Sequence, residues 1–567
     1  VRVKTAEAGQ HVYTGQVAYD NVYGNLSEFT EKVGENRQEF GTKFGYDDEN
    51  RPTSLTYSAS GKEIGQSTTT IDKLNRTTFS ALKLGSKTFT SEYHFAAGGY
   101  GTGSVTNLVS SITQPGCNCG YGYDDNGNIA SATLNGKWTG YTYDALGQLV
   151  QVNDHSDTRS GENGTTWKYT YDLGGNILKK ERFAYADTTN PLETVTYTYG
   201  DANWRDKLTA VNGNAIRYDA IGNPLNDGTW TYTWQNGRQL QKMQKAGVTA
   251  EFVYNADGLR VQKTVNGVAT KYTLHGKNVV HMTSGTDELH FFYDAQNRPA
   301  VVVYNGTAYA YVKSLQGDIL AILDENGNTV VSYGYDAWGA PLWCTGELAE
   351  TLGKVQPFRY RGYVFDEETG LYYLRSRYYN PRWGRFANAD AEIAVEAKLW
   401  DAKLFLYCAN NPVRYTDDGG NSFWDVLADC GKALLVAAVV VAVVAVVIAA
   451  TGGGGGFALA AAGGEIISGA AVADAAMTTA VAAGATGASL MFASRAGKKF
   501  EEDYYSNHYK SHNQAENGQF KEAVRRLKDN YDMNLTQDQQ QRLHYAIRHK
   551  GYSLEEIIEE ALNMFGE

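Results

Sequence analysis

Apolar and aromatic side chains alternate with polar ones over short runs along most of this chain, and each run ends at a similar turn. Tyr141 and Tyr143 lie two positions apart, so they face the same side of an extended strand. Asp144 can accept hydrogen bonds from backbone N–H groups two residues further on, and Gly147 supplies a positive φ without steric cost. Leu149 then begins the next apolar run. The segment therefore predicts a β-hairpin.

The same phrase, a Tyr-Asp pair followed by Gly and often by Asn or Gln, returns along the chain. It occurs at 19–25, 123–128, 143–148, 171–176, 218–223 and 335–339, with weaker copies at 46–47, 254–258 and 293–294. A repeated hairpin phrase predicts a long antiparallel sheet of hairpins laid edge to edge. The 40 Tyr, 61 Gly and only 9 Pro fit a mainly β chain before residue 425. We expect inner-face tyrosines either to form ladders whose hydroxyls contact water or to be cross-strand packing pairs.

Length, charge and cysteine content narrow the function classes. A chain of 567 residues can bury several cores, and its net charge of −12 argues against general nucleic-acid binding by its β part. The five cysteines have neither a disulfide framework nor a zinc spacing, so no cofactor is predicted. The chain starts at Val1 within a repeat, without a signal peptide. We therefore expect it to be the C-terminal part of a longer protein whose export route its sequence does not reveal.

Residues 357–421 differ from the repeats because Arg and Tyr alternate densely there. In strands, such alternation places guanidinium groups and rings on opposite faces or stacks them across neighbours. The stretch from Tyr360 to Asp390, and the stretch 404–413 that follows it, resemble the core-associated segment of the RHS/YD-repeat family. Relatives in that family include the teneurins and the C components of insecticidal toxin complexes. The resemblance covers roughly residues 1–421.

The resemblance implies a mainly β fold, a spiralling, cocoon-like shell of antiparallel β-hairpins over residues 1–345. A core segment at 346–421 would close the shell, and a variable C-terminal domain, often a toxin, would be held inside it or released. In several bacterial members, aspartates near the end of the core cut the chain. Asp390 matches the first acidic position, and Asp417 or Asp418 the second. A close carboxylate pair can share a proton, with one member acting as base and the other as acid.

This sequence also departs from the pattern of the members that cleave. They usually carry Asp-Pro-x-Gly, whereas the run from Asp417 to Gly420 contains no proline, and none follows Asp390. Two interpretations therefore stay open. Asp417 and Asp418 either take part in self-cleavage or only cap a turn before Gly419.

Residues 422–493 are rich in Ala, Gly and Val, and residues 433–450 contain no charge. Their length is near the minimum of roughly 17–25 residues for a membrane span. Three interpretations stay open: a helical hairpin across a membrane, a hydrophobic segment sheltered in the shell until release, and a plain buried helix. Similar basic flanks leave the orientation undecided.

Residues 494–567 predict a small all-α module, because two capping boxes precede helical apolar patterns there. His508 and His512 are four residues apart, as are His544 and Arg548. A histidine pair with an arginine offers a base, an acid and a phosphate clamp for metal-free phosphodiester cleavage. The alternative is that these histidines are structural, since their spacing matches no nuclease or zinc-protease motif.

Two functions from different classes follow. In the first, the chain is the C-terminal part of an RHS-type polymorphic toxin, whose shell encapsulates and delivers the helical effector in competition between bacteria. Its expected partners are a cognate immunity protein and a secretion-system or surface component. In the second, it is a cell-surface structural or adhesion protein, anchored by residues 433–450, whose shell binds carbohydrate or protein. Both place it outside or on the surface of a bacterium, and whether the effector is an enzyme stays open.

Overall fold

The computed structural model describes most of the first 420 residues and little beyond them. The described residues are 2–8, 11–20, 25–34, 37–98, 104–391, 403–420, 424–425, 527 and 561. The chain divides into two compact units, residues 1–441 and residues 442–567. Within the described part, no helix is both long and apolar enough to cross a membrane. The predicted apolar segment 433–450 and nearly all of the predicted helical module lie outside it.

Two long antiparallel sheets make up most of the first unit, and each strand pairs with its neighbour in the sequence. The first sheet has 18 strands: β1 (Arg2–Ala8), β2 (His11–Tyr19), β3 (Leu26–Val33), β4 (Gln38–Tyr46), β5 (Pro52–Ala59), β6 (Lys62–Ile71), β7 (Thr77–Leu84), β8 (Lys87–Ala97), β9 (Val105–Thr113), β10 (Cys119–Tyr123), β11 (Ile129–Leu134), β12 (Lys137–Tyr143), β13 (Leu149–Asp154), β14 (Thr165–Tyr171), β15 (Ile177–Ala184), β16 (Glu193–Thr198), β17 (Ala210–Val211) and β18 (Asn214–Ala215). The second has 14: β19 (Arg217–Tyr218), β20 (Pro224–Asn226), β21 (Thr231–Gln235), β22 (Gln239–Lys245), β23 (Val248–Tyr254), β24 (Arg260–Val265), β25 (Val268–His275), β26 (Asn278–Ser284), β27 (Asp287–Tyr293), β28 (Pro299–Tyr304), β29 (Thr307–Lys313), β30 (Ile319–Leu323), β31 (Thr329–Tyr335) and β32 (Pro341–Thr345).

The smaller elements follow the second sheet. They are α1 (Leu352–Val355), a sheet of β33 (Val364–Asp366), β34 (Leu371–Leu374), β35 (Arg377–Asn380) and β36 (Arg385–Phe386), and the pair β37 (Tyr415–Thr416) and β38 (Trp424–Asp425). Short 3-10 turns occur at Thr158–Ser160, Tyr360–Gly362 and Cys408–Asn410. The prediction of a mainly β chain built from antiparallel hairpins is confirmed for the described residues.

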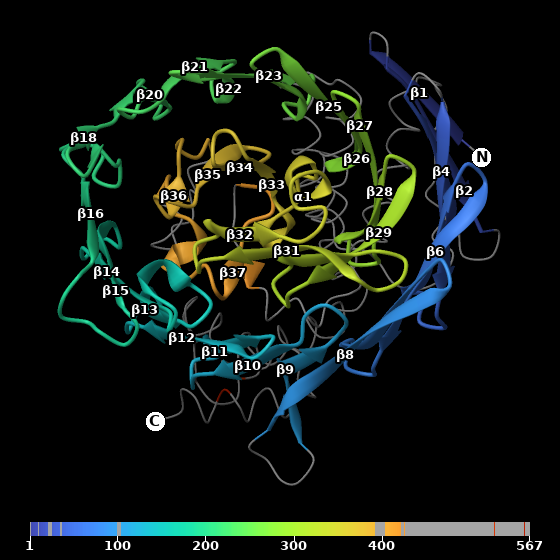
Figure 1. The fold of residues 1–567 in the computed structure, drawn as a ribbon, viewed down its shortest axis with the longest axis horizontal. Coiled ribbons are helices and arrows are strands. Elements are labelled where there is room, and N and C mark those ends of the chain that lie inside the picture. Colours follow the sequence, from blue (N-terminus) through green and yellow to red (C-terminus); the bar gives the residue numbers. More distant parts are fainter. Residues whose placement is uncertain are drawn as a thin grey trace. The chain divides into compact units, whose positions relative to one another are not determined.

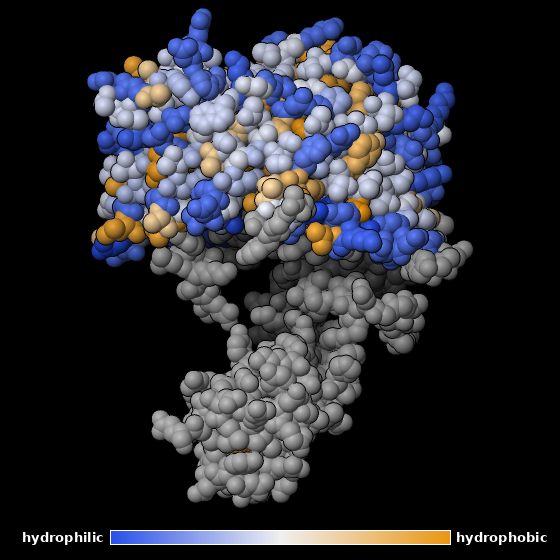
Figure 2. Space-filling model, turned by 90° about the horizontal axis from the view of Figure 1, so that it is seen from below, coloured by the Kyte–Doolittle hydropathy of each residue, from blue (hydrophilic) through white to orange (hydrophobic). Residues whose placement is uncertain are grey.

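The strands of the first unit wind as a spiral (Figure 1). The first sheet and the start of the second form an outer ring, and later strands of the second sheet continue inside the arc of β2 to β8 (Figure 1). Direct contacts join the two layers. The Tyr57 hydroxyl donates to the Tyr293 carbonyl at 3.0 Å, and Gln114 Nε2 donates to the Lys313 carbonyl at 2.7 Å. The outer wall seen in Figure 2 is largely hydrophilic, with scattered hydrophobic residues.

The aspartate of each repeat phrase organises its turn. Asp124 Oδ1 accepts the backbone N–H groups of Asn126 and Asn128 at 2.9 and 2.8 Å, while Oδ2 accepts Asn128 Nδ2 at 2.9 Å. Gly127 has a φ of 74°, which glycine adopts without strain. The carboxylate pairs in the same way with the residue four positions on at Asp144, Asp172, Asp219 and Asp324. Asn and Gln suit this position because their side chains complete the pairing as neutral donors, and arginine takes the same place at Arg51 and Arg76, whose Nε donates to Asp47 and Asp72.

The repeat tyrosines bond to the backbone rather than to water. The Tyr143 hydroxyl donates to the Ile129 carbonyl at 2.7 Å, on the strand that precedes its own. The ladder between these strands begins at Ser131, so the hydroxyl satisfies a carbonyl beyond its open end. The same bond joins Tyr46 to Leu26, Tyr123 to Val109, Tyr171 to Leu149, Tyr254 to Leu240, Tyr293 to Val279 and Tyr335 to Ile319. The expectation that these hydroxyls contact water is therefore wrong.

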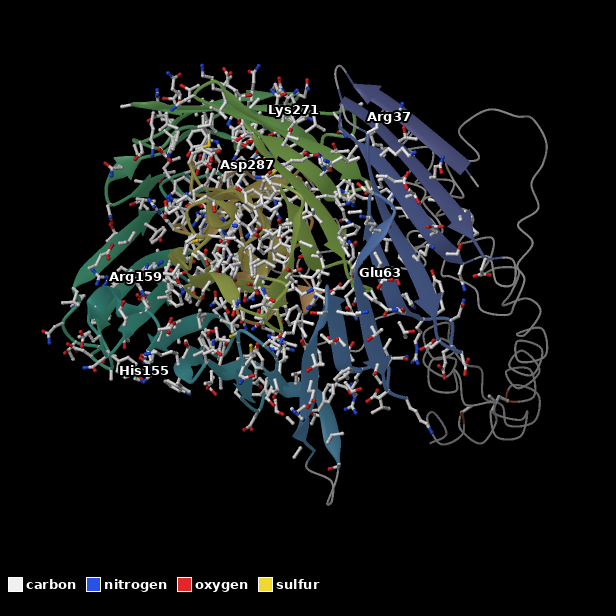
Figure 3. All side chains as sticks on the ribbon, turned by 45° about the vertical axis from the view of Figure 1, so that its right-hand side comes forward. Arg37, Glu63, His155, Arg159, Lys271 and Asp287 are labelled. Carbon is white, nitrogen blue, oxygen red and sulfur yellow. The ribbon has the colours of Figure 1, made fainter. Side chains whose placement is uncertain are left out.

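Residues 346–420 follow β32, and we call them the core segment; its described residues, 346–391 and 403–420, lie within the ring (Figure 1). Figure 3 shows side chains filling the space between the surrounding strands and this segment. Its arginines stack on aromatic rings, since the Arg361 guanidinium lies 4.4 Å from the Tyr360 ring centre and that of Arg377 lies 3.5 Å from the Phe386 ring centre. Arg260 of β24 stacks in the same way on Tyr373 of the core segment, at 4.4 Å. Arg260 Nη1 also pairs with Asp366 at 2.6 Å in a fully buried contact. Of the two arrangements predicted for the Arg-Tyr alternation, stacking is the one observed.

A buried polar cluster lies where the N-terminal strands meet the inner layer. The Tyr13 hydroxyl donates to Glu31 Oε1 at 2.8 Å, and His290 Nε2 lies 3.7 Å from Glu31 Oε2. Phe40 stacks on the His290 ring at a centroid distance of 3.6 Å. Burial raises the pKa of Glu31 to about 8, against a smaller lowering by the Tyr13 hydrogen bond. Burial also lowers the pKa of His290, so this contact is between neutral groups near neutral pH.

We expect Glu31→Gln to stabilise the shell in a pH-dependent way. Because the folded-state pKa of Glu31 is raised, its contribution to stability is fully present below its unfolded-state pKa and is lost as the pH rises through about 8. The substitution should raise the free energy of unfolding by on the order of 4 kcal/mol at pH 8 and by little at pH 4.5. Denaturant unfolding at the two pH values measures this, with Glu63→Gln, an exposed position on β6 (Figure 3), as the control. An equal effect at both pH values would contradict the account.

Candidate functional site

Successive repeat turns present buried amide side chains to the core segment. Asn128, Gln148 and Asn176 follow three consecutive Tyr-Asp turns, and each is no more than 4% exposed. Their side-chain nitrogens are committed to the turn aspartates, which leaves the amide oxygens as acceptors. The turns therefore offer a row of fixed acceptors at one level of the shell.

Two asparagines of the core segment donate hydrogen bonds to this row of acceptors. Asn411 Nδ2 donates to Asn128 Oδ1 at 3.1 Å and to the Gly147 carbonyl at 2.9 Å. Asn410 repeats the pattern one turn further on, with Gln148 Oε1 at 2.8 Å. Each asparagine therefore bridges two neighbouring turns, and the pair fixes the spacing of three.

The backbone that carries these asparagines is strained. Cys408, Ala409 and Asn410 have consecutive φ values of 49°, 50° and 60°, which L-residues rarely adopt in sequence. Each such residue costs about 1 kcal/mol or more. The strain persists because the buried hydrogen bonds of Asn410 and Asn411 over-determine the conformation.

A loop of the shell around Asp206 positions the part of the core segment around Leu404. Asp206 Oδ2 accepts the backbone N–H of Leu404 at 2.9 Å, and Arg385 Nη2 donates to the Asp206 carbonyl at 2.9 Å. The Leu404 carbonyl in turn accepts the backbone N–H of Asp390 at 2.8 Å. The shell thereby fixes the place of one of the predicted aspartates.

Asp390 and Asp417 meet at a single arginine. Arg377 Nη2 lies 3.1 Å from Asp390 Oδ2 and 3.3 Å from Asp417 Oδ2. The three residues are buried, with exposed fractions of 4% for Arg377, 8% for Asp390 and 2% for Asp417. Burial lowers the pKa of Arg377, and the two aspartates oppose that shift. The structure thus brings two of the three predicted aspartates together on a shared cation.

The same arginine holds the end of the core segment. Arg377 Nε donates to the Gly420 carbonyl, and Nη1 donates to the Leu404 carbonyl at 3.1 Å. Asp417 Oδ1 accepts the Gly420 N–H at 2.7 Å, and the Tyr363 hydroxyl accepts the Asp417 N–H at 2.7 Å. Both backbone polar groups of Gly420 are therefore hydrogen-bonded: its N–H donates to a carboxylate, and its carbonyl accepts from a guanidinium.

Asp418 lies apart from this cluster. Its side chain is exposed, and Oδ1 accepts the Thr416 hydroxyl at 3.2 Å. Its carbonyl accepts Arg375 Nη1 at 3.0 Å. Asp417 both contacts Arg377 and caps the turn before Gly420, so the geometry is compatible with each of the two roles predicted for it.

Comparison with known proteins places this fold in a family. The Teneurin YD-shell family matches residues 132–413. The tRNA3(Ser)-specific nuclease WapA of Bacillus spizizenii is 37% identical over 292 residues, covering 50% of this chain and 12% of WapA. Double-stranded DNA deaminase toxin A of Burkholderia cenocepacia is 24% identical over 353 residues, covering 57% of this chain and 22% of that toxin. A chain in the crystal structure of TcdB2-TccC3-Cdc42 has the same fold, with a TM-score of 0.58, 19% identity, and coverage of 74% of this chain and 22% of that one.

This chain belongs to the RHS/YD-repeat family. The resemblance inferred from the Tyr-Asp phrase and the Arg-Tyr segment is thereby confirmed. The chain spans only about 12% of the length of WapA. The RHS shell and its core segment are therefore shared with these relatives, while the activities of the whole relatives belong to much longer proteins.

The other predicted site residues of this RHS chain lie outside the described residues. They are His508, His512, His544 and Arg548. Within the described ranges, no three His, Cys, Asp or Glu side chains gather closely enough to hold a metal ion. Sequence reasoning missed Arg377, Tyr363 and Gly420. The dense Arg-Tyr alternation marked their neighbourhood, but the contacts that single them out come from residues distant in the sequence.

We expect Gly420→Ala to release the end of the RHS core segment, whereas Gly419→Ala leaves it in place. Gly420 has a φ of 76°, and an added Cβ would lie 2.5 Å from the Leu374 carbonyl oxygen. A Cβ at Gly419 would meet nothing within 4 Å. The first substitution should cost at least about 1 kcal/mol from backbone strain alone. Limited proteolysis of the purified chain, followed by mass spectrometry of cuts near residues 415–425, measures the release; equal cutting in both variants would contradict it.

Proposed function

We propose that this chain is the shell and core of an RHS-type toxin, which carries the residues after Gly420 as its effector. Two relatives that match about half of this chain carry names for different reactions, a tRNA nuclease and a double-stranded DNA deaminase. A segment common to proteins with different named activities supplies something other than the reaction. Carriage of a variable effector is the role that fits a closed shell.

The end of the core segment is the observation that carries this proposal. The two buried aspartates, Arg377 and Gly420 converge where the core segment ends. A carrier needs a defined boundary between shell and cargo, and a residue whose N–H and carbonyl are both hydrogen-bonded to the core segment provides one. We place that boundary at the Gly420–Asn421 bond.

We propose further that this bond is hydrolysed by the site itself. Arg377 Nε donates to the Gly420 carbonyl, so it would polarise that carbonyl and stabilise the oxyanion that forms on attack. One of the two carboxylates on Arg377 takes a proton from the attacking water, and the other, protonated, gives a proton to the departing Asn421 nitrogen. Water thus adds across the bond, leaving a carboxyl group on Gly420 and an amine on Asn421.

The wider proposal keeps the expectations for the effector. His508, His512, His544 and Arg548 are its candidate residues, and residues 433–450 its candidate membrane-interacting segment. A cognate immunity protein is the expected partner, because a producer of such an effector needs protection from it. Secretion or delivery out of the producing bacterium follows from the same role.

Expression of the full chain in a bacterium without an immunity protein tests release and toxicity together. We expect slowed growth, and an intact-mass measurement should show a break between Gly420 and Asn421. Asp390→Asn and Asp417→Asn should each abolish the break, because each removes one ionisable carboxyl group of the pair. Asp418→Asn is the matched control and should leave the break unchanged, since its carboxylate lies outside the cluster.

The intact-mass measurement tests self-release, and the growth measurement tests toxicity. An uncut wild-type chain would contradict self-release but not carriage. Unimpaired growth, both with the full chain and with residues 422–567 expressed alone, would contradict the toxin assignment.

A further inference from the structure

A cavity of about 480 Å³ lies between the repeat turns of the second sheet and the core segment. The turns that line it are those around Asn278, Asn297 and Gln316, while the core segment contributes Phe358 and Tyr363 among others. In the first sheet, Asn410 and Asn411 fill the corresponding space over the turns. Over the second sheet the space stays open, and its volume is in the range of small-molecule sites, roughly 300–1,000 Å³.

The walls of this cavity, which we call the turn cavity, carry a strong excess of positive charge. Its cationic lining residues are Arg260, Lys277, Arg298, Arg361 and Arg375, and its one carboxylate is that of Asp418. Arg260 and Arg361 are neutralised by their own partners, Asp366 and Asp318. The two remaining arginines, Arg298 and Arg375, give the turn cavity a positive character that an anion would relieve.

Arg298 and Arg375 are the two cations whose charge is least compensated. Neither has a carboxylate within salt-bridge distance among residues whose placement is described, and both are half-buried. Arg298 Nη1 donates to the Leu315 carbonyl at 3.2 Å, and Arg375 Nη1 donates to the Asp418 carbonyl at 3.0 Å. A guanidinium has five N–H donors in a planar fork, so one such bond orients each arginine and leaves donors for a ligand.

The uncharged lining residues indicate what chemical group is attached to the anion. Tyr293, Phe358 and Tyr373 contribute aromatic surface, and Asn297 and Gln316 contribute amide groups. Planar guanidinium forks match the geometry of phosphate oxygens, and aromatic walls accommodate a compact organic body. The lining therefore fits a small ligand with a phosphate group better than a bare halide or a neutral molecule.

We propose that the turn cavity binds a small phosphate-bearing ligand, with Arg298 and Arg375 donating to its phosphate oxygens and Lys277 contributing charge at the rim. This site is separate from the Arg377 cluster, and its occupancy does not depend on hydrolysis or on the effector. It shares Asp418 and Arg375 with the end of the core segment, so a bound ligand lies next to the shell–cargo boundary.

Isothermal titration of the full chain with inorganic pyrophosphate tests the proposal, with potassium chloride of equal ionic strength as the reference. We expect saturable binding of one pyrophosphate per chain. Arg298→Gln and Arg375→Gln should each weaken it about tenfold, the effect of losing one charge-assisted hydrogen bond. Arg217→Gln, which removes the same charge from an exposed position on β19, should leave the affinity unchanged.

Three outcomes would overturn the proposal: no saturable binding, equal weakening by Arg217→Gln, or tighter binding of a poly-glutamate peptide than of pyrophosphate. The last would identify an acidic segment as the occupant. Lys277→Gln keeps the test decisive if the arginine variants fail to fold, because Lys277 is exposed at the rim. It should weaken pyrophosphate binding at least twofold without changing the thermal unfolding midpoint.

Discussion

The aspartate of the Tyr-Asp turn is the constraint on which the rest of this structure depends. Its carboxylate fixes the turn and holds the amide side chain four residues on, as Asp144 holds Gln148 at 2.8 Å. Because the amide nitrogen is committed, its oxygen is presented as an acceptor at the same level in successive repeats. The core segment binds this row, and the same segment carries the three residues of the Arg377 cluster. Local turn chemistry is thus linked to the proposed boundary between shell and cargo.

Backbone strain and burial are concentrated where the core segment contacts the repeat turns and where it ends at Gly420. The left-handed run at Cys408, Ala409 and Asn410 is unfavourable alone, and the positive φ of Gly420 is one that only glycine adopts without strain. They are held by hydrogen bonds to partners far away in the sequence, such as Asn128 and Arg377. The site therefore depends on contacts between the core segment and the repeat turns, and it is complete only when these contacts are made.

The repeats could be predicted from the sequence because their interactions are local. Tyr141, Tyr143, Asp144 and Gly147 together specify strand, turn and register within a dozen residues. The role of the tyrosine hydroxyls could not be predicted in this way. Their acceptors lie on the preceding strand beyond the end of its ladder, which a composition-based expectation of wet inner faces does not reveal.

The site was predicted only in part. The resemblance pointed to Asp390 and to either Asp417 or Asp418, and the structure places Asp390 and Asp417 on one nitrogen of Arg377. Nothing in the alternation of Arg and Tyr distinguishes Arg377 from Arg375, two residues away. Arg377 binds the Gly420 carbonyl and Arg375 lines the turn cavity, because Arg375 lies in the turn between β34 and β35 with a φ of 64°, whereas Arg377 begins β35. Only the three-dimensional arrangement separates these roles.

Hydrogen–deuterium exchange of residues 415–420 in the full chain tests the central claim most directly. The Asp417 amide donates to the buried Tyr363 hydroxyl, and the Gly420 amide donates to Asp417 Oδ1. If the core segment closes the shell and holds the chain at Gly420, these two amides should exchange at least about 1,000-fold more slowly than in an unstructured peptide. Exchange at the unstructured rate would contradict the account, because the boundary would then not be held by the core.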